Sequence, residues 1–260
     1  MVDKYCWLGP GANKPFDSII SDWKISKLTK RSICVLQYIK EHSPMNIKEY
    51  DDNIIQYLKD NGVGSDNLTK KHTYGHFLFV NFISRNEGKL EITESGLDFL
   101  NCIDAEKYEK ATEIYLDQLF DANFETDATK DIEIRAFPVQ IMFKLLYDNE
   151  IIPLFMFQTH IQFIKDYSDL LVCLNLLDGD CFFKYIQELE DFYNEDEDKF
   201  KSIYKLGINK WKSYVIGGLV VLGFFDKESY DKGYLKFSDY GIRYVEDKDI
   251  YNISYNEMFY

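Results

Sequence analysis

The 260-residue sequence has few of the residues that build disulfide-rich or metal-binding proteins. Its five cysteines are scattered, odd in number and never in a C-x-x-C spacing, which predicts reduced core thiols rather than disulfides. The four histidines include one close pair, His72 and His76, without an acidic partner at a metal-ligand spacing. We therefore expect no metal site.

Long hydrophobic runs are also missing. No apolar run reaches the ~18 residues that a membrane-spanning helix needs, and the first residues lack the pattern of a secretion signal. These absences predict a cytoplasmic protein that has no membrane partner.

The common catalytic motifs are absent too. The sequence has no G-x-x-x-x-G-K-S/T phosphate loop, no G-x-S-x-G nucleophile turn and no H-E-x-x-H pair. Residues 196–199 and 246–248 contain the letters of a magnesium-dependent nuclease motif, but neither stretch lies on an apolar strand. No catalytic residue and no cofactor are predicted, and Mg²⁺ is expected only if a nuclease activity or a nuclease partner is present.

What the sequence does contain is a folded chain with an uneven charge. With 46% hydrophobic and 17% aromatic residues, it suits one large or two ordinary domains. Its net charge of −14 is concentrated in the middle: residues 76–200 carry 10 basic and 27 acidic side chains, against 11 and 9 before them and 9 and 8 after them. An anionic partner should therefore meet the two ends of the chain.

One pattern occurs twice without gaps, at Gly88–Leu100 and at Gly233–Val245. Each copy has a glycine turn, alternating apolar residues and then a capping residue, Thr93 or Ser238, followed by an acid and an apolar helical face. The pattern predicts a short strand that leads into a capped helix, once in each half of the chain.

Apolar segments precede both copies, at residues 76–83 and 218–225, and we expect them to form the other strand of a hairpin. A hairpin followed by a helix ends many winged-helix modules, although any small α+β domain can contain these elements. The sequence predicts an α+β, mostly helical fold with two winged-helix-like modules, each ending in a β-hairpin and a capped helix. Residues 1–128 would hold an N-terminal arm, the first module and an acidic connector, and residues 129–260 the second module with an acidic helical insertion.

Two basic, polar segments stand before the predicted hairpins. In the first module, an amphipathic helix with a basic face, a second helix near residues 47–58 and the polar segment 67–74 follow the winged-helix order, which gives that segment the position of a recognition helix. In the second module, the basic, aromatic segment 199–214 has the same position. The DNA-binding candidates are Lys27, Lys30, Arg31, Asn67, Thr69, Lys70, Lys71, His72, Tyr74, Lys201, Lys205, Asn209, Lys210 and Lys212.

The segments at residues 73–80, 88–96 and 134–146 resemble the N-terminal recognition region of AlwI-like type IIS restriction and nicking endonucleases, a resemblance that spans residues 65–247. It implies tandem winged-helix-like subdomains that read DNA, followed by a separate C-terminal metal-dependent cleavage domain. Since the sequence stops at Tyr260, we expect a recognition module whose cleavage activity comes from a separate nuclease subunit.

The first hypothesis is therefore sequence-specific binding of double-stranded DNA by the recognition module or specificity subunit of a restriction-modification system. Two alternatives stay open. The chain is a protein-interaction protein of winged-helix type that does not bind DNA, its acidic centre contacting a basic partner, or it is a Mg²⁺-dependent endonuclease with an unrecognised site.

Overall fold

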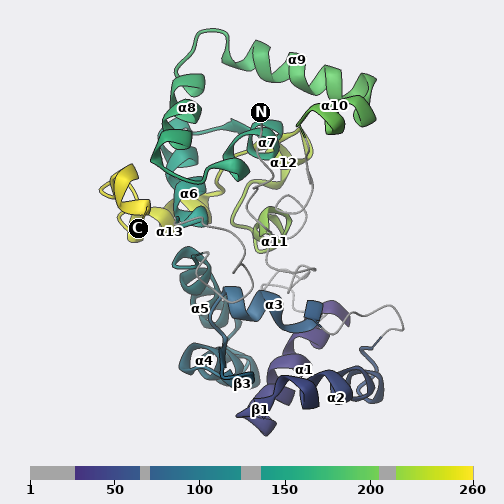
Figure 1. Ribbon diagram of the computed structural model, residues 1–260. Helices are drawn as coiled ribbons and strands as arrows, with labels where there is room; N and C mark the ends of the chain where they lie inside the picture. The colour runs from purple at the N-terminus through teal and green to yellow at the C-terminus, as the bar shows by residue number, and fades with distance from the viewer. Residues whose placement is uncertain (1–26, 65–70, 124–135, 205–214, 260) are drawn as a thin grey trace. The chain divides into compact units, whose positions relative to one another are not determined.

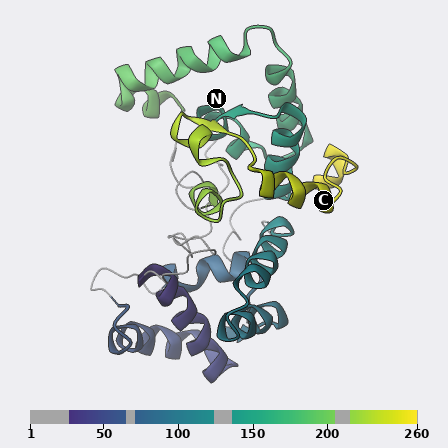
Figure 2. The same ribbon diagram turned by 180° about the vertical axis from the view of Figure 1, so that it is seen from behind.

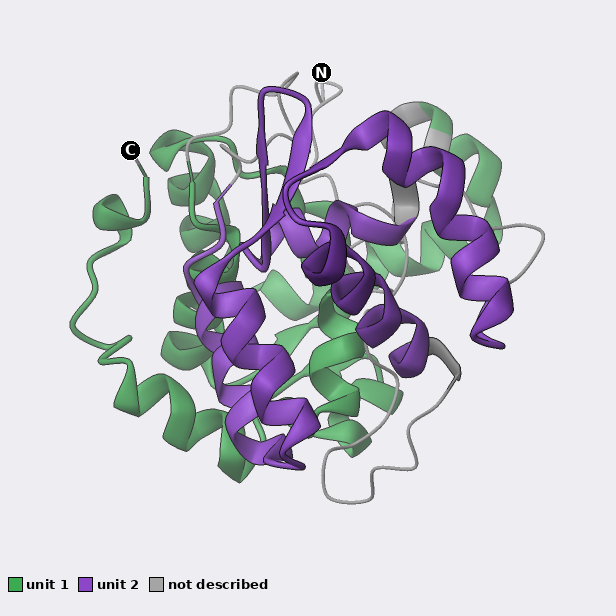
Figure 3. Cartoon of the chain, turned by 90° about the horizontal axis from the view of Figure 1, so that it is seen from below, with its two compact units in different colours: residues 1–8, 131–260 green, residues 9–130 purple. Residues whose placement is uncertain are grey.

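The structure is a computed structural model that describes residues 27–64, 71–123, 136–204 and 215–259. They form two compact units, unit 2 within residues 9–130 and unit 1 within residues 131–260 (Figures 1 and 3). Both units are mostly helical with small antiparallel sheets, so the α+β class predicted from the sequence is confirmed. The domain boundary predicted between residues 128 and 129 lies outside the described residues.

Unit 2 consists of helices around a three-stranded sheet whose strand order is β1-β3-β2, with both pairs antiparallel. The last two strands form a hairpin, and α4 packs against α5 after it. The elements are α1 (Lys27–His42), β1 (Met45–Asn46), α2 (Ile47–Asp60), α3 (Lys71–Phe79), β2 (Ile83–Asn86), β3 (Lys89–Ile92), α4 (Glu94–Asp104) and α5 (Tyr108–Phe120).

The hairpin of unit 2 turns at Glu87 and Gly88, whose φ angles are 47° and 79°. Two-residue hairpin turns of this kind need positive φ at both central positions, and glycine adopts it without steric cost. The turn fixes the register, in which Leu90 lies opposite both Met45 of β1 and Arg85 of β2. Leu90 is fully buried, so this register directs the sheet towards the core.

Unit 1 has a two-stranded sheet, β4 paired with β5, and an insertion of three helices between α7 and α11. Figures 1 and 2 show α9 running along one edge of the unit. The elements are α6 (Pro138–Asn149), β4 (Ile152–Pro153), α7 (Leu154–Thr159), the 3-10 helix η3 (Ile161–Phe163), α8 (Tyr167–Leu177), α9 (Phe182–Glu195), α10 (Glu197–Tyr204), α11 (Gly217–Val221), α12 (Lys227–Asp231), β5 (Tyr234–Leu235), α13 (Asp239–Asp247) and the 3-10 helix η5 (Tyr255–Met258).

Both predicted helix caps are confirmed. Thr93 accepts a hydrogen bond from the backbone N–H of Gly96 at 3.1 Å, and Ser238 accepts one from Gly241 at 3.0 Å. Each hydroxyl also donates to a carbonyl just before the first strand of its hairpin, at 2.6 Å in both units. The cap therefore satisfies an orphan helix N–H and ties the helix to the segment that precedes the hairpin.

The two apolar segments at residues 76–83 and 218–225 were predicted as strands, and this prediction is wrong. Helix α3 continues to Phe79 and α11 to Val221, and the strand pairing starts only at Ile83 and Phe225. Residues 73–80 are all buried, so the run has no polar face that would distinguish a helix from a strand. Short, wholly apolar runs are ambiguous for this reason.

The second hairpin is not a simple hairpin. Phe225 bridges to Phe237, but the residues between them form α12, and β5 pairs with β4 instead. Asp226 caps α12 by accepting the backbone N–H of Ser229 at 2.7 Å. A short helix therefore takes the place of the tight turn found in unit 2.

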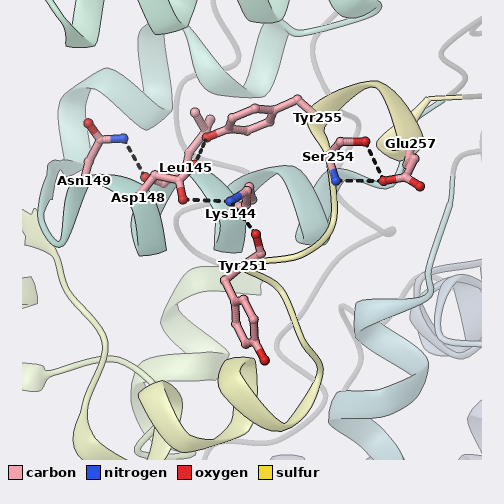
Figure 4. A network of polar contacts seen from close by, with 8 residues as sticks. All are labelled: Lys144, Leu145, Asp148, Asn149, Tyr251, Ser254, Tyr255 and Glu257. Atoms are coloured by element: carbon pink, nitrogen blue, oxygen red, sulfur yellow. Dashed lines mark hydrogen bonds and ion pairs between the residues drawn. The ribbon is translucent and has the colours of Figure 1, made fainter.

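A polar network fastens the C-terminal segment of unit 1 to α6 (Figure 4). The ammonium of Lys144 donates to Asp148 at 2.8 Å, and the Tyr255 hydroxyl donates to the other oxygen of the same carboxylate at 2.7 Å. The Lys144 ammonium also lies 5.7 Å from the centre of the Tyr255 ring. Because the Lys144 side chain is only 11% exposed, these contacts compensate for its loss of hydration.

Candidate nucleic-acid interface

Few of the predicted DNA-binding side chains fall within the described residues. Asn67, Thr69, Lys70, Lys205, Asn209, Lys210 and Lys212 lie outside them. The backbone of four more is described, Lys27 in α1, Lys71 and His72 in α3 and Lys201 in α10, but their side chains are not. The structure describes the side chains of Lys30, Arg31 and Tyr74.

Arg31 and Lys30 are neighbours on α1 with different surroundings. Lys30 is exposed, whereas Arg31 is half-buried and donates from Nε to the carbonyl of Val63 at 2.9 Å. Val63 follows the end of α2, so this bond fixes the chain just before the polar segment 65–70 begins. In the structure, Arg31 therefore acts on the position of that segment, and only Lys30 presents its cation to solvent.

Tyr74 belongs to the core, which corrects its predicted place among the DNA contacts. It is 6% exposed, its ring meets the ring of Tyr50 edge-on at 5.2 Å between centroids, and burial raises its pKa. The neighbouring Thr73 shares a buried hydrogen bond of 2.6 Å with the Tyr50 hydroxyl. These contacts anchor α3 against α2, so Tyr74 supports a contact surface rather than forming one.

Beyond Thr73, α3 presents no polar surface. His76 is fully buried and neutral: burial lowers its pKa to about 3, and its Nε2 lies 3.1 Å from the hydroxyl of Tyr115. Its Nδ1 has no hydrogen-bond partner. Since no three His, Cys, Asp or Glu side chains of the described segments lie close enough together to hold a metal ion, His76 is a core residue of α3.

The hairpin of unit 2 exposes two cations that the sequence argument did not select. Arg85 on β2 and Lys89 on β3 are both exposed, as is Asn86 beside the turn. The glycine turn at Gly88 was recognised in the sequence, and the residues that flank such a turn extend into solvent, so the same signal could have identified them.

The corresponding region of unit 1 carries balanced charge. On α12, Lys227 forms an ion pair with Asp231 at 2.6 Å, and Lys232 beside its end forms one with Glu228 at 2.5 Å. All four side chains are more than half exposed, so these pairs stabilise the short helix only slightly. They also leave this loop without a net positive charge for phosphates.

The described cysteines are all free, as expected, but they are not all in the core. Cys173 is buried, and burial raises the pKa of its thiol to about 12, whereas Cys181 before α9 is exposed. Cys34 and Cys102 are half-buried.

No helix of the described ranges has the length and apolar character needed to cross a membrane. No protein-family model matches the chain. A search of curated proteins also found no significant match.

Proposed function

We propose that the chain is a cytoplasmic protein that binds double-stranded DNA sequence-specifically through two winged-helix-like modules, as the recognition module or specificity subunit of a restriction-type endonuclease. The observation that carries the proposal is the element order of unit 2. Helix, strand, helix, helix and hairpin follow one another, and the sheet has the order β1-β3-β2. This is the order of a winged-helix module, in which the third helix enters the major groove and the hairpin is the wing.

The surroundings of the third helix support the same assignment. The buried residues of α3 from Thr73 onwards hold the helix against α2, and Arg31 fixes the chain after α2 through Val63. The polar side chains of residues 67–72 stand at the start of this helix in the sequence. Recognition helices contact base edges mainly through their N-terminal residues, so this arrangement suits Asn67, Thr69 and His72 as base-reading residues.

The wing of unit 2 supplies a second set of contacts in this proposal. Arg85 and Lys89 are exposed on its two strands, and side chains of this kind position a protein on phosphates without reading sequence. The first module would therefore provide both base-reading and phosphate-binding residues. A separate nuclease subunit would supply cleavage, and Mg²⁺ would be needed only there.

The experiment compares charge reversals in a gel-shift titration at two salt concentrations. Lys70→Glu with Lys71→Glu, and Arg85→Glu with Lys89→Glu, should each weaken DNA binding and reduce the salt dependence by about one log unit per lost phosphate contact. The matched control is Lys107→Glu with Lys110→Glu, which makes the same change of charge on the exposed N-terminal end of α5. Equal binding by all three double variants would contradict the proposal.

A second candidate function is protein interaction without DNA. The observation that favours it is that the described part of α3 is buried from Thr73 to Phe79, whereas a helix that fills a major groove exposes one polar face. This candidate predicts no DNA affinity even at low salt. The wild-type chain in the same titration distinguishes the two candidates.

A further inference from the structure

The three inserted helices of unit 1 form a surface that combines apolar and acidic side chains. We call α8, α9 and α10 the acidic arm. Eight large hydrophobic side chains of the described residues are exposed, and five of them lie on α8 and α9: Tyr167, Leu171, Val172, Phe183 and Tyr185. An exposed apolar group of this size on one short segment is a mark of an interaction surface.

Two of these five side chains already have partners within unit 1. The ring of Tyr167 lies edge-on to Phe259 at 6.2 Å between centroids, and the hydroxyl of Tyr185 lies 3.4 Å from Nε2 of His160. Val172 and Phe183 are the most exposed of the group, at 58% and 57%. They form the apolar part of the surface that no contact within the unit explains.

The apolar face that holds α9 in place is a different one. Phe182, Ile186 and Leu189 recur at helical spacing and are all buried. Phe183 is one residue, or about 100°, further around the helix, and Glu190 lies two turns away from it on the same side. Phe183 therefore stands on a solvent-facing flank of α9 beside acidic side chains.

The charge of the arm is strongly negative. Residues 178–199 contain nine acidic and two basic side chains, a net charge of −7. Of the two lysines, Lys184 lies 3.7 Å from Glu188, and Lys199 lies over the ring of Phe192 at 5.6 Å. Asp191 and Glu197 accept hydrogen bonds from the neutral donors Gln187 and Tyr193, which leaves their charge in place.

We propose that the acidic arm, centred on Val172 and Phe183, is a docking site for a basic amphipathic helix of another protein. A helix with apolar residues on one stripe and lysine or arginine beside it matches both properties of the surface, since apolar anchors give affinity and complementary charge gives orientation. DNA and anionic lipid surfaces are repelled by the same charge. A second copy of this chain, with its own net charge of −14, is repelled as well.

This inference goes beyond DNA binding and does not depend on it, because every residue that carries it lies on the inserted helices of unit 1. In unit 2, α2 ends at Asp60 and α3 starts at Lys71, so the connection at the same point of the element order is short. The arm is thus an addition to a framework that is complete without it.

A labelled probe peptide tests the proposal by fluorescence anisotropy. The probe has roughly 18 residues, about five helical turns, with leucine on one face and lysine on the rest. One comparison peptide has the same composition in an order without helical periodicity, and another has glutamate in place of lysine. The lysine helix should bind the full chain with a stoichiometry of one, and both comparison peptides should bind at least about tenfold more weakly, a difference of about 1.4 kcal/mol.

Variants locate the binding. Val172→Ser with Phe183→Ser, and Glu190→Lys with Asp191→Lys, should each weaken probe binding about tenfold. Ile242→Ser on α13 is the apolar control, since this side chain is 37% exposed outside the arm. Glu94→Lys with Asp98→Lys on the exposed side of α4 is the charge control. Both controls should bind the probe as the wild-type chain does.

Several results would overturn the proposal. Equal loss of binding in the arm and control variants would mean attraction to net charge alone, and unchanged binding in the arm variants would mean another site. Light scattering that shows a dimer of the wild-type chain, abolished by Val172→Ser with Phe183→Ser, would assign the surface to a second copy. Circular dichroism of each variant checks the fold, and the charge-reversal pair tests the same surface independently of the apolar pair.

Discussion

Units 1 and 2 are built on the same framework, which appears in the backbone more clearly than in the sequence. Leu90 opposite Met45 in unit 2 corresponds to Leu235 opposite Ile152 in unit 1. In each unit the residue after the first strand donates its N–H to the glycine of the hairpin turn, at 3.0 Å and 2.8 Å. Two segments that share only a strand-and-cap pattern thus reproduce one set of long-range contacts.

The units differ in what connects their second and third helices. Unit 2 passes from α2 to α3 over residues 61–70, whereas unit 1 inserts the whole acidic arm between α7 and α11. The hairpins differ as well, since unit 2 has a two-residue turn and unit 1 has α12. The shared framework carries the fold, and the variable connections carry the charge, positive on the wing of unit 2 and strongly negative on the arm of unit 1.

The sharpest test of the shared framework is a methyl group on either of two glycines. A Cβ on Gly96 would lie 2.1 Å from the carbonyl oxygen of Phe82, and one on Gly241 would lie 2.2 Å from that of Phe224. Because the obstacle is backbone, Gly96→Ala and Gly241→Ala should each lower the free energy of unfolding by about 3 kcal/mol. Urea unfolding measures this, and hydrogen exchange shows which unit loses stability.

Gly218→Ala is the matched control for these two variants. Gly218 also lies on a helix, α11, and a Cβ there would meet no atom within 4 Å. Alanine favours a helix over glycine by about 1 kcal/mol, so this variant should be neutral or slightly more stable. If only one of the two cap-side glycines were sensitive, the correspondence between the units would be broken at that point.

The parts of the framework that the sequence predicts are the local ones. Thr93 and Ser238 are recognisable as caps because the hydroxyl, the following acid and the apolar face all lie within a few residues. Pro138 was likewise expected in the first turn of a helix, and it is the first residue of α6. These signals need no knowledge of the rest of the chain.

The parts that the sequence does not predict depend on distant residues. Pairing of β1 with β3 joins Met45 to Leu90, and the helical state of residues 76–79 depends on neighbours that bury every side of the run. The role of Arg31 is set by its bond to Val63, 32 residues away. Of the candidate site, the basic character of Lys30 survives in the structure, whereas the burial of Tyr74 could not be read from a polar segment.

The buried ion pair of unit 1 should break the comparison, because unit 2 has the neutral Gln37 where unit 1 has Lys144. Asp148→Ala leaves the Lys144 ammonium, 11% exposed, without its carboxylate, and should lower the free energy of unfolding by about 2 kcal/mol. Lys144→Met places an apolar side chain of similar length in the same site and should change stability by less than about 1 kcal/mol. Thermal or urea unfolding that finds Lys144→Met the more damaging of the two would contradict this account of the network.

Each unit also contains a buried neutral histidine, which gives the comparison a pH dependence. The folded pKa of His76 is about 3 and that of His160 about 4, both lowered by burial. The unfolded chain, with a histidine pKa of about 6.5, therefore takes up the proton first. The stability is complete above that value and is lost as the pH falls towards the folded pKa.

His76→Gln tests this dependence in unit 2. For the wild-type chain, His76 should contribute a loss of about 1.4 kcal/mol for each pH unit below about 6. The variant should show a smaller slope of unfolding free energy between about pH 6.5 and 5.5, where few carboxylates titrate. His160→Gln should do the same for unit 1, and a slope unchanged by either substitution would mean that the histidine is charged in the folded state.

The smallest expected effect tests the feature that the sequence predicted best. Thr93→Ala and Ser238→Ala each remove a cap that accepts from a glycine N–H and donates to a carbonyl before the hairpin. Each should lower the free energy of unfolding by about 1 kcal/mol, whereas Thr93→Ser and Ser238→Thr keep the hydroxyl and should change it little. Since both caps have nearly the same geometry, urea unfolding should give the two alanine variants equal losses. Unequal losses would mean that the inserted arm or α12 changes how strongly α13 depends on its cap, which would limit the equivalence of the units to their backbone.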